Sequence, residues 1–133
     1  MIRNQSELKA MTTEMEDVRI ANFILSGQKS LDMKKQQSMK NLTIGVNALS
    51  SISVLELSGL EKLERVIIMR GGVYGGSGRL RVVNCSSLHD IDIGEHAFMN
   101  YKNLEWMDLP LLQTIELGNY AFQKVYTIMM QSK

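Results

Sequence analysis

An internal repeat of 24 residues constrains this 133-residue chain more than any other feature of its sequence. The segments 88–98 (LHDIDIGEHAF) and 112–122 (LQTIELGNYAF) align position by position, and steps of 24 or 25 residues towards the N-terminus find three further units. The five units begin near residues 15, 39, 63, 88 and 112. A unit of this size cannot bury its apolar side chains alone, so we expect the units to stack on one another.

Within each unit the apolar residues recur at fixed positions, which form columns from unit to unit. One pair of columns lies two residues apart and holds Val18, Leu42, Val66, Ile91 and Ile115, then Ile20, Ile44, Ile68, Ile93 and Leu117. A second pair with the same spacing holds Leu31, Leu55, Leu80, Leu104 and Ile128, then Met33, Leu57, Val82, Trp106 and Met130. A spacing of two is the period of a strand with one buried face. The residues between the first pair should therefore face solvent: Arg19, Thr43, Ile67, Asp92 and Glu116.

These columns predict one strand per coil, with a shorter extended segment on the opposite side of the coil. No unit shows a period of about 3.6 residues, so the returns should be mostly non-helical. The predicted fold is a solenoid of about five coils with a parallel β-sheet over residues 15–133, preceded by a polar segment or crude cap at residues 1–14. Phe98 should stack on Phe122, and one inserted residue should lie in the glycine-rich segment 71–78.

The segment 39–49 (MKNLTIGVNAL) matches the pattern Leu-x-x-Leu-x-Leu-x-x-Asn-x-Leu, and so the chain resembles a leucine-rich-repeat solenoid. The phrases beginning at Ile44, Ile93 and Leu117 (apolar-Gly-x-x-Ala-apolar) are similar to surface-antigen-like repeat arrays of protists and bacteria. This resemblance implies a right-handed solenoid that binds proteins, commonly on its concave strand face. The other units depart from the pattern at the asparagine position, which predicts a less regular turn; they carry Phe23, Gly71, His96 and Tyr120 there.

Composition narrows the function classes. A net charge of +1 gives no basic excess for nucleic-acid binding. One cysteine, Cys85, rules out a disulfide scaffold, and its place in a leucine column indicates a buried thiol. No apolar run approaches the roughly 20 residues that span a bilayer. Without a signal segment in this sequence the expected location is the cytoplasm, or the cell surface if the chain is a piece of a longer protein.

The predicted strand face carries the candidate partner-binding residues. It can be interpreted as an ordinary solvated face or as a partner patch centred on exposed Ile67, because interface cores favour apolar and arginine side chains. Asp90 and Asp92 alternate onto one face as metal ligands would, but they occupy ordinary exposed positions, so no metal site is predicted. The glycine-rich segment lacks a phosphate-binding pattern and is interpreted as a loop. The candidate residues are Arg19, Arg65, Ile67, Met69, Arg70, Asp90, Asp92 and Glu116.

No arrangement of acid, base or nucleophile is apparent, so we expect no catalytic activity and no cofactor. The leading hypothesis is a protein–protein interaction module that binds a protein partner through the concave strand face. The alternative is a structural or adhesive segment of a longer surface-antigen-like array. The sequence stops within a strand pair without a cap, which indicates either a piece of a longer array or edge-to-edge self-association of the last coil.

Overall fold

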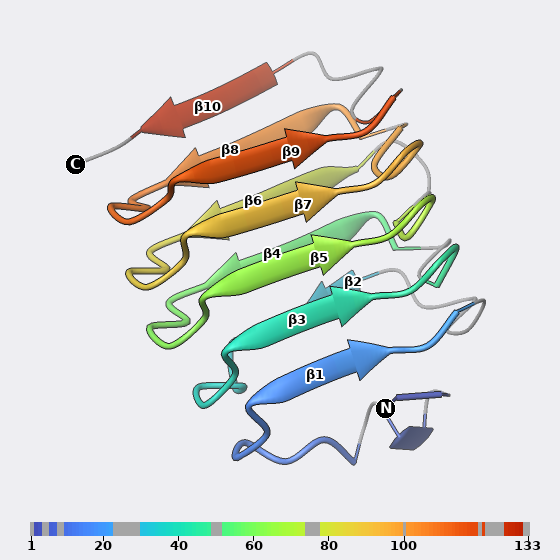
Figure 1. Ribbon diagram of the computed structural model, residues 1–133, viewed down its shortest axis with the longest axis vertical. Helices are drawn as coiled ribbons and strands as arrows, with labels where there is room; N and C mark the ends of the chain where they lie inside the picture. The colour runs from blue at the N-terminus through green and yellow to red at the C-terminus, as the bar shows by residue number, and fades with distance from the viewer. Residues whose placement is uncertain are drawn as a thin grey trace.

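In the computed structural model, the described residues contain ten strands, which form two parallel sheets that the chain visits alternately (Figure 1). The odd sheet contains, in spatial order, β1 (Asp17–Ile20), β3 (Asn41–Ile44), β5 (Arg65–Ile68), β7 (Asp90–Ile93) and β9 (Thr114–Leu117). The even sheet contains β2 (Ser30–Asp32), β4 (Val54–Ser58), β6 (Arg79–Val83), β8 (Asn103–Met107) and β10 (Thr127–Gln131). Each strand pairs with the strand one coil away, so the chain is a parallel β-solenoid, as the repeat predicts.

The structure describes most of the chain, and the statements below concern that part alone. It describes residues 2–3, 6–7, 10–22, 30–48, 52–73, 78–99, 101–119, 121 and 127–131, without the side chains of Asp32 and of 127–131. The predicted contact of Phe98 with Phe122 therefore lies outside the described residues.

The register of the odd sheet confirms the predicted columns. Ile20 pairs with Ile44, Ile44 with Ile68, Ile68 with Ile93, and Ile93 with Leu117. The offset is 24 residues except between β5 and β7, and between β4 and β6, where it is 25. Both exceptions place the extra residue between Ile68 and Arg79, which agrees with the predicted insertion in the glycine-rich segment.

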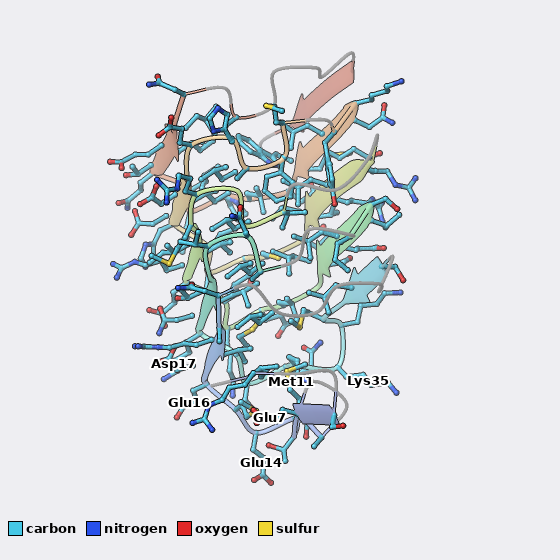
Figure 2. The ribbon with its side chains drawn as sticks, turned by 90° about the vertical axis from the view of Figure 1, so that its right-hand side faces the viewer. Glu7, Met11, Glu14, Glu16, Asp17 and Lys35 are labelled. Carbon is cyan, nitrogen blue, oxygen red and sulfur yellow. The ribbon has the colours of Figure 1, made fainter. Side chains whose placement is uncertain are left out.

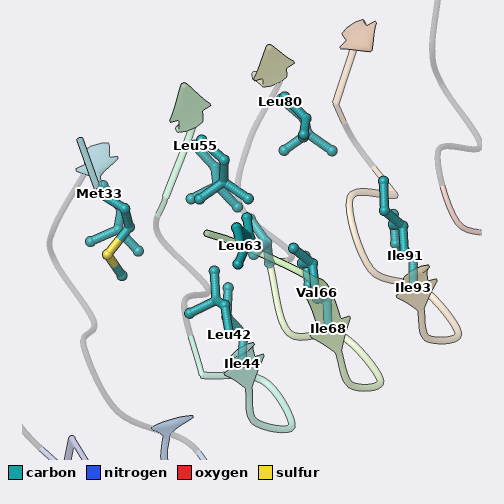
Figure 3. Close-up of a cluster of buried hydrophobic side chains, with 14 of the residues drawn as sticks. Met33, Leu42, Ile44, Leu55, Leu63, Val66, Ile68, Leu80, Ile91 and Ile93 are labelled. Carbon is teal, nitrogen blue, oxygen red and sulfur yellow. The ribbon is translucent and has the colours of Figure 1, made fainter. Parts of the chain in front are cut away.

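The core lies between the two sheets, where side chains from facing strands meet (Figure 3). Leu42, Val66 and Ile91 from the odd sheet point towards Leu55 and Leu80 from the even sheet, and all five are buried. Fully burying an aliphatic side chain of this size contributes about 1.5–3 kcal/mol. The stack is therefore stabilised by apolar layers that repeat in every coil.

The second side of the coil differs from its prediction. It was expected as a shorter extended segment, but β4, β6 and β8 have five residues each, against four in each strand of the odd sheet. The reason is that this segment has its own partner one coil away. Its backbone groups are paired along a full ladder, so it forms a second sheet and not an irregular return.

The turns after the odd strands are more regular than the sequence predicts. Asn47, Gly71 and His96 occupy the asparagine position of the repeat, and all three have a left-handed backbone, with φ of 51°, 61° and 64°. Asn, His and Gly are the residues that adopt this conformation most readily. Each also donates its backbone N–H to a carbonyl in the next coil, at 2.8–3.1 Å. The shared requirement is therefore a backbone conformation, which a consensus based on side chains does not reveal.

Tyr101 is a core residue that the repeat pattern does not identify. Its ring is fully buried and meets Phe98 edge to face, with the ring centroids 4.9 Å apart and the planes at 69°. Its hydroxyl donates a hydrogen bond to the carbonyl oxygen of Ile52 at 2.6 Å, which satisfies the polar end of the side chain. Burial raises the pKa of Tyr101 well above its usual range.

The two ends of the odd sheet differ. At the first end Ile2 is buried and pairs with Ile20, adding one residue to the stack below β1. At the other end β9 pairs only with β7 among the described strands, and Leu117 is 52% exposed. No helix in the described part of the chain is long and apolar enough to cross a membrane.

Neighbouring residues of β7 provide a test of the two faces. Ile93 is buried in the stacked column, so Ile93→Asp places an unpaired charge in the core and should lower the free energy of unfolding by more than about 4 kcal/mol. Asp92 is exposed, and Asp92→Ala should change the free energy of unfolding by less than about 0.5 kcal/mol. Urea unfolding measures both variants, and equal losses would contradict the assignment of the faces.

Gln36 is the polar exception in a buried apolar column that continues with Leu60, Cys85 and Leu109. Its side-chain oxygen is buried and has no hydrogen-bond partner among the described residues. Gln36→Leu removes this unpaired group and should raise the free energy of unfolding by about 1 kcal/mol.

The matched control for this substitution is Gln113→Leu, because Gln113 is exposed and the change removes no buried polar group. Denaturant midpoints of the two variants against the wild type measure the difference. A Gln36→Leu protein that is less stable than the wild type would show that the amide makes a needed contact in the folded state.

Candidate functional site

Polar and charged side chains project outwards from both sheets, away from the apolar layers (Figure 2). Because each strand pairs in register with the next, residues 24 or 25 apart lie on neighbouring strands of the same face. The outer face of the odd sheet therefore consists of two columns. The first contains Asp17, Asn41, Arg65, Asp90 and Thr114, and the second contains Arg19, Thr43, Ile67, Asp92 and Glu116.

The outer face of the odd sheet is hollowed over β5, β7 and β9. The hollow has a volume of about 260 Å³. Half-buried Ile67 lies in it between charged neighbours, and the alternation of the strand directs these side chains away from the core. The hollow is lined by Arg65, Ile67, Asp90, Ile91, Asp92, Thr114 and Glu116.

Two ion pairs neutralise most of the charge on this face. Arg19 lies 3.3 Å from Asp17 at the first end of the sheet, and Arg65 Nη2 lies 3.4 Å from Asp90 Oδ2 beside the hollow. Both pairs are substantially exposed, so each contributes little to stability. On this surface, the charge of each of these four residues is therefore balanced by its partner.

Asp92 and Glu116 form the remaining charged pair of this face. They are directly opposite each other in the register of β7 and β9, and both are exposed. Neither carboxylate has a cationic partner in the part of the chain that the structure describes. Like charges in directly opposite positions destabilise a sheet, so this edge of the hollow carries an uncompensated negative charge.

Asp90 connects the hollow to the adjoining corner of the solenoid. Its Oδ2 lies 2.9 Å from His89 Nδ1, in addition to the contact with Arg65. Partial desolvation raises the pKa of Asp90, but the hydrogen bonds and charges of His89 and Arg65 outweigh it and hold the pKa below its usual value. The carboxylate is thus held ionised and in place at one side of the hollow.

A column of alternating acidic and basic side chains lies at the corner just before the odd strands. Lys40 Nζ lies 3.0 Å from Glu16 Oε1, and His89 Nε2 lies 3.9 Å from Glu64 Oε1. The hydrogen bond to Glu16 raises the pKa of Lys40. This corner also has a hollow of about 550 Å³, lined by Glu14, Glu16, Ser38, Lys40, Lys62, Glu64 and Ser87. Its charges are mixed, and Lys40 is paired with Glu16.

The even sheet carries a second charged column, which the repeat predicts as the mostly polar residues between the second pair of apolar columns; its ion pairs are not among the predictions. Arg81 lies between two acidic neighbours on adjacent strands, 3.0 Å from Glu56 and 2.8 Å from Glu105. Hydrogen bonds to Glu105 and Glu56 raise the pKa of Arg81. The 24-residue offset contains the signal for such columns, because it places residues of opposite sign on neighbouring strands.

The predicted partner-binding residues fall into two groups. Five of them line the hollow together, and three do not. Arg19 lies on β1 at the far end of the face, while Met69 and Arg70 follow the end of β5 and lie in the turn. Arg70 is predicted on the strand face but does not lie there, because β5 ends at Ile68. The five in the hollow are Arg65, Ile67, Asp90, Asp92 and Glu116.

Cys85 lies in the core, as predicted. It is fully buried, with its Sγ 3.5 Å from the carbonyl oxygen of Val83, and burial raises the pKa of its thiol. A protonated, inaccessible thiol is a poor nucleophile. Among the described residues, no three His, Cys, Asp or Glu side chains converge as a metal site would require.

Fold and face together define the class of this protein: a parallel β-solenoid with a hollowed, charge-patterned strand face. No protein-family model matches the chain, and the comparisons with curated proteins and with solved structures found no match either. The geometry of the face is therefore the basis for assigning a function.

The lowered pKa of Asp90 makes the stability of the fold depend on pH. A carboxyl whose folded pKa lies below its unfolded pKa stabilises the fold above the unfolded pKa, near 3.9, and this contribution is lost as the pH falls through the folded pKa. The difference in unfolding free energy between the wild type and Asp90→Asn should therefore be largest above about pH 5 and shrink towards pH 2.

Urea unfolding between pH 2 and pH 6 measures this difference. Arg65→Gln, which removes one of the two partners of Asp90, should reduce it. A difference that stays constant or grows towards low pH would contradict the role assigned to His89 and Arg65.

Proposed function

We propose that this protein is a non-catalytic interaction module that binds a protein partner through the outer face of the odd sheet. The observation that carries the proposal is the hollow over β5, β7 and β9, with half-buried Ile67 surrounded by charged and polar side chains. An apolar centre with an arginine beside it and a polar rim is the composition of a protein interface.

The size of the hollow favours a protein side chain over a small-molecule ligand. Its volume of about 260 Å³ lies below the 300–1,000 Å³ typical of small-molecule sites, and it is a shallow feature of a sheet surface. It suits one or two side chains of a partner that lies across the strands. Such a partner would gain affinity from the surrounding face as well.

The rigidity of the face supports the same function. Arg65, Ile67 and Asp92 lie on strands that are paired in register on both edges, so their backbone positions are set before a partner arrives. A preorganised surface loses less conformational freedom on binding, which leaves more of the contact energy for affinity.

A structural or adhesive role in a longer repeat array is the second candidate. It is favoured by a different surface at the end of the odd sheet: among the described strands β9 pairs only with β7, and Leu117 on β9 and Leu111 shortly before it are 52% and 54% exposed. An edge strand with exposed apolar side chains suits pairing with another strand, including that of a second copy. The two candidates differ in the surface that they use, so a substitution on the odd face separates them.

The test is a selection of peptides from a random display library on the immobilised chain. We expect selected peptides to bind the wild type and to bind Ile67→Asp at least about tenfold more weakly, because a charge replaces the apolar centre of the interface. Affinities are measured by fluorescence polarisation, and circular dichroism verifies that the variant is folded.

Thr43→Asp is the matched control. Thr43 is half-buried in the same column on the neighbouring strand and lies outside the hollow, so its substitution should not weaken binding of the selected peptides as Ile67→Asp does. Peptides that bind the wild type and Ile67→Asp equally well would refute the proposed face and favour the structural role.

A further inference from the structure

We infer that the partner is a basic, extended peptide segment, whose lysine or arginine stem lies on Ile67 and whose cationic head lies between Asp92 and Glu116. This inference rests on the proposed function and adds the chemistry of the ligand. It follows from the charges of the face, from the spacing of the strands and from the ion pair that Arg65 makes with Asp90.

The charges of the outer face leave one site for a cation. Of the charged residues in its two columns, Asp17 is paired with Arg19, and Asp90 is paired with Arg65. Only Asp92 and Glu116 remain without a cation in the described part of the chain, and they are neighbours in register. A cation between the two carboxylates replaces a repulsion with two attractions, so the face is complementary to a positively charged group.

The apolar neighbour selects a cation with an aliphatic stem. Ile67 is directly opposite Asp92 on the adjoining strand, about 4.8 Å away, and Glu116 is one strand further along the same column. Lysine and arginine side chains bury their methylene stems on apolar surface while the charged head stays among polar groups. A stem that crosses Ile67 therefore delivers its charge to Asp92 and Glu116.

Other ligand chemistries fit this face less well. An acidic segment would meet the two unpaired carboxylates, and Arg65 offers it little because its guanidinium already contacts Asp90. A divalent cation such as Ca²⁺ takes six to eight oxygen ligands, whereas this edge provides two carboxylates on an open surface. A purely apolar segment would leave the like-charged pair without compensation.

The experiment uses three synthetic peptides of equal length: one alternating lysine and leucine, one alternating glutamate and leucine, and one alternating lysine and serine. Each is titrated into the isotope-labelled chain while amide resonances are followed by NMR. We expect the lysine–leucine peptide to shift the resonances of Ile67, Asp92 and Glu116. The lysine–serine peptide should bind at least about fivefold more weakly, and the glutamate–leucine peptide should leave these resonances unchanged.

Substitutions test the two carboxylates directly. Asp92→Asn and Glu116→Gln should each weaken binding of the lysine–leucine peptide at least about fivefold. Raising the NaCl concentration from 50 to 300 mM should weaken binding of this peptide to the wild type more than to either variant. Asp17→Asn is the control: it removes a carboxylate from the same face, but one that is paired and distant from the hollow. Its affinity should equal that of the wild type.

The outcomes distinguish this inference from the proposed function. If the glutamate–leucine peptide shifts the Ile67 resonance as strongly as the lysine–leucine peptide, the docking face stands and the cationic partner is wrong. If Asp17→Asn weakens binding of the lysine–leucine peptide as much as Asp92→Asn does, the peptide is attracted by the overall negative charge of the face and not by Asp92 and Glu116. The inference is then wrong as well. If the lysine–leucine peptide leaves the resonances of Ile67, Asp92 and Glu116 unshifted, the inference fails. The proposed docking face fails as well only if the peptides from the display selection bind the wild type and Ile67→Asp equally well. If Ca²⁺ alone shifts Asp92 and Glu116 at millimolar concentration and displaces the peptide, the site is a cation site and not a peptide site.

Discussion

Backbone hydrogen bonds between neighbouring coils, whose paired residues lie 24 or 25 positions apart, are the interaction on which the rest of this structure depends. Each coil donates and accepts along both sheets and at the turns between them, so equivalent positions lie directly above one another. This alignment turns a repeated sequence into continuous apolar files such as Ile20, Ile44, Ile68 and Ile93, all buried. No coil could satisfy its own backbone groups, so the coil is stable only as a layer in the stack.

The same alignment makes neighbours of charges that are far apart in the sequence. Arg81 contacts one glutamate in the coil below and one in the coil above, and Lys40 contacts Glu16 across a single coil. Where signs alternate from coil to coil, the column is neutralised. On the odd sheet, Asp92 and Glu116 are instead like charges on neighbouring strands, and both line the hollow beside Ile67.

Binding at such a face requires little rearrangement of the chain. The side chains of the hollow project from strands that also carry the core on their other side, as Ile67 does between buried Val66 and Ile68. In the proposed function, one residue would contact the ligand while its two neighbours hold the strand in position. Because of this alternation, substitution of outer residues such as Ile67 and Asp92 should leave the apolar files in place.

The sequence by itself determined the stack. Period-two alternation within a 24-residue repeat can bury its apolar residues only in strands that lie above one another, so the columns, the site of the inserted residue and buried Cys85 followed from the pattern. The sequence also placed Arg65, Ile67, Asp90, Asp92 and Glu116 on one face. Tertiary structure decided the second full sheet, the burial of Tyr101 against Phe98, and the left-handed turns at Asn47, Gly71 and His96. It also decided which carboxylates find a cation. These features depend on distances and backbone angles across coils, and a pattern of residue types specifies neighbours without specifying their geometry.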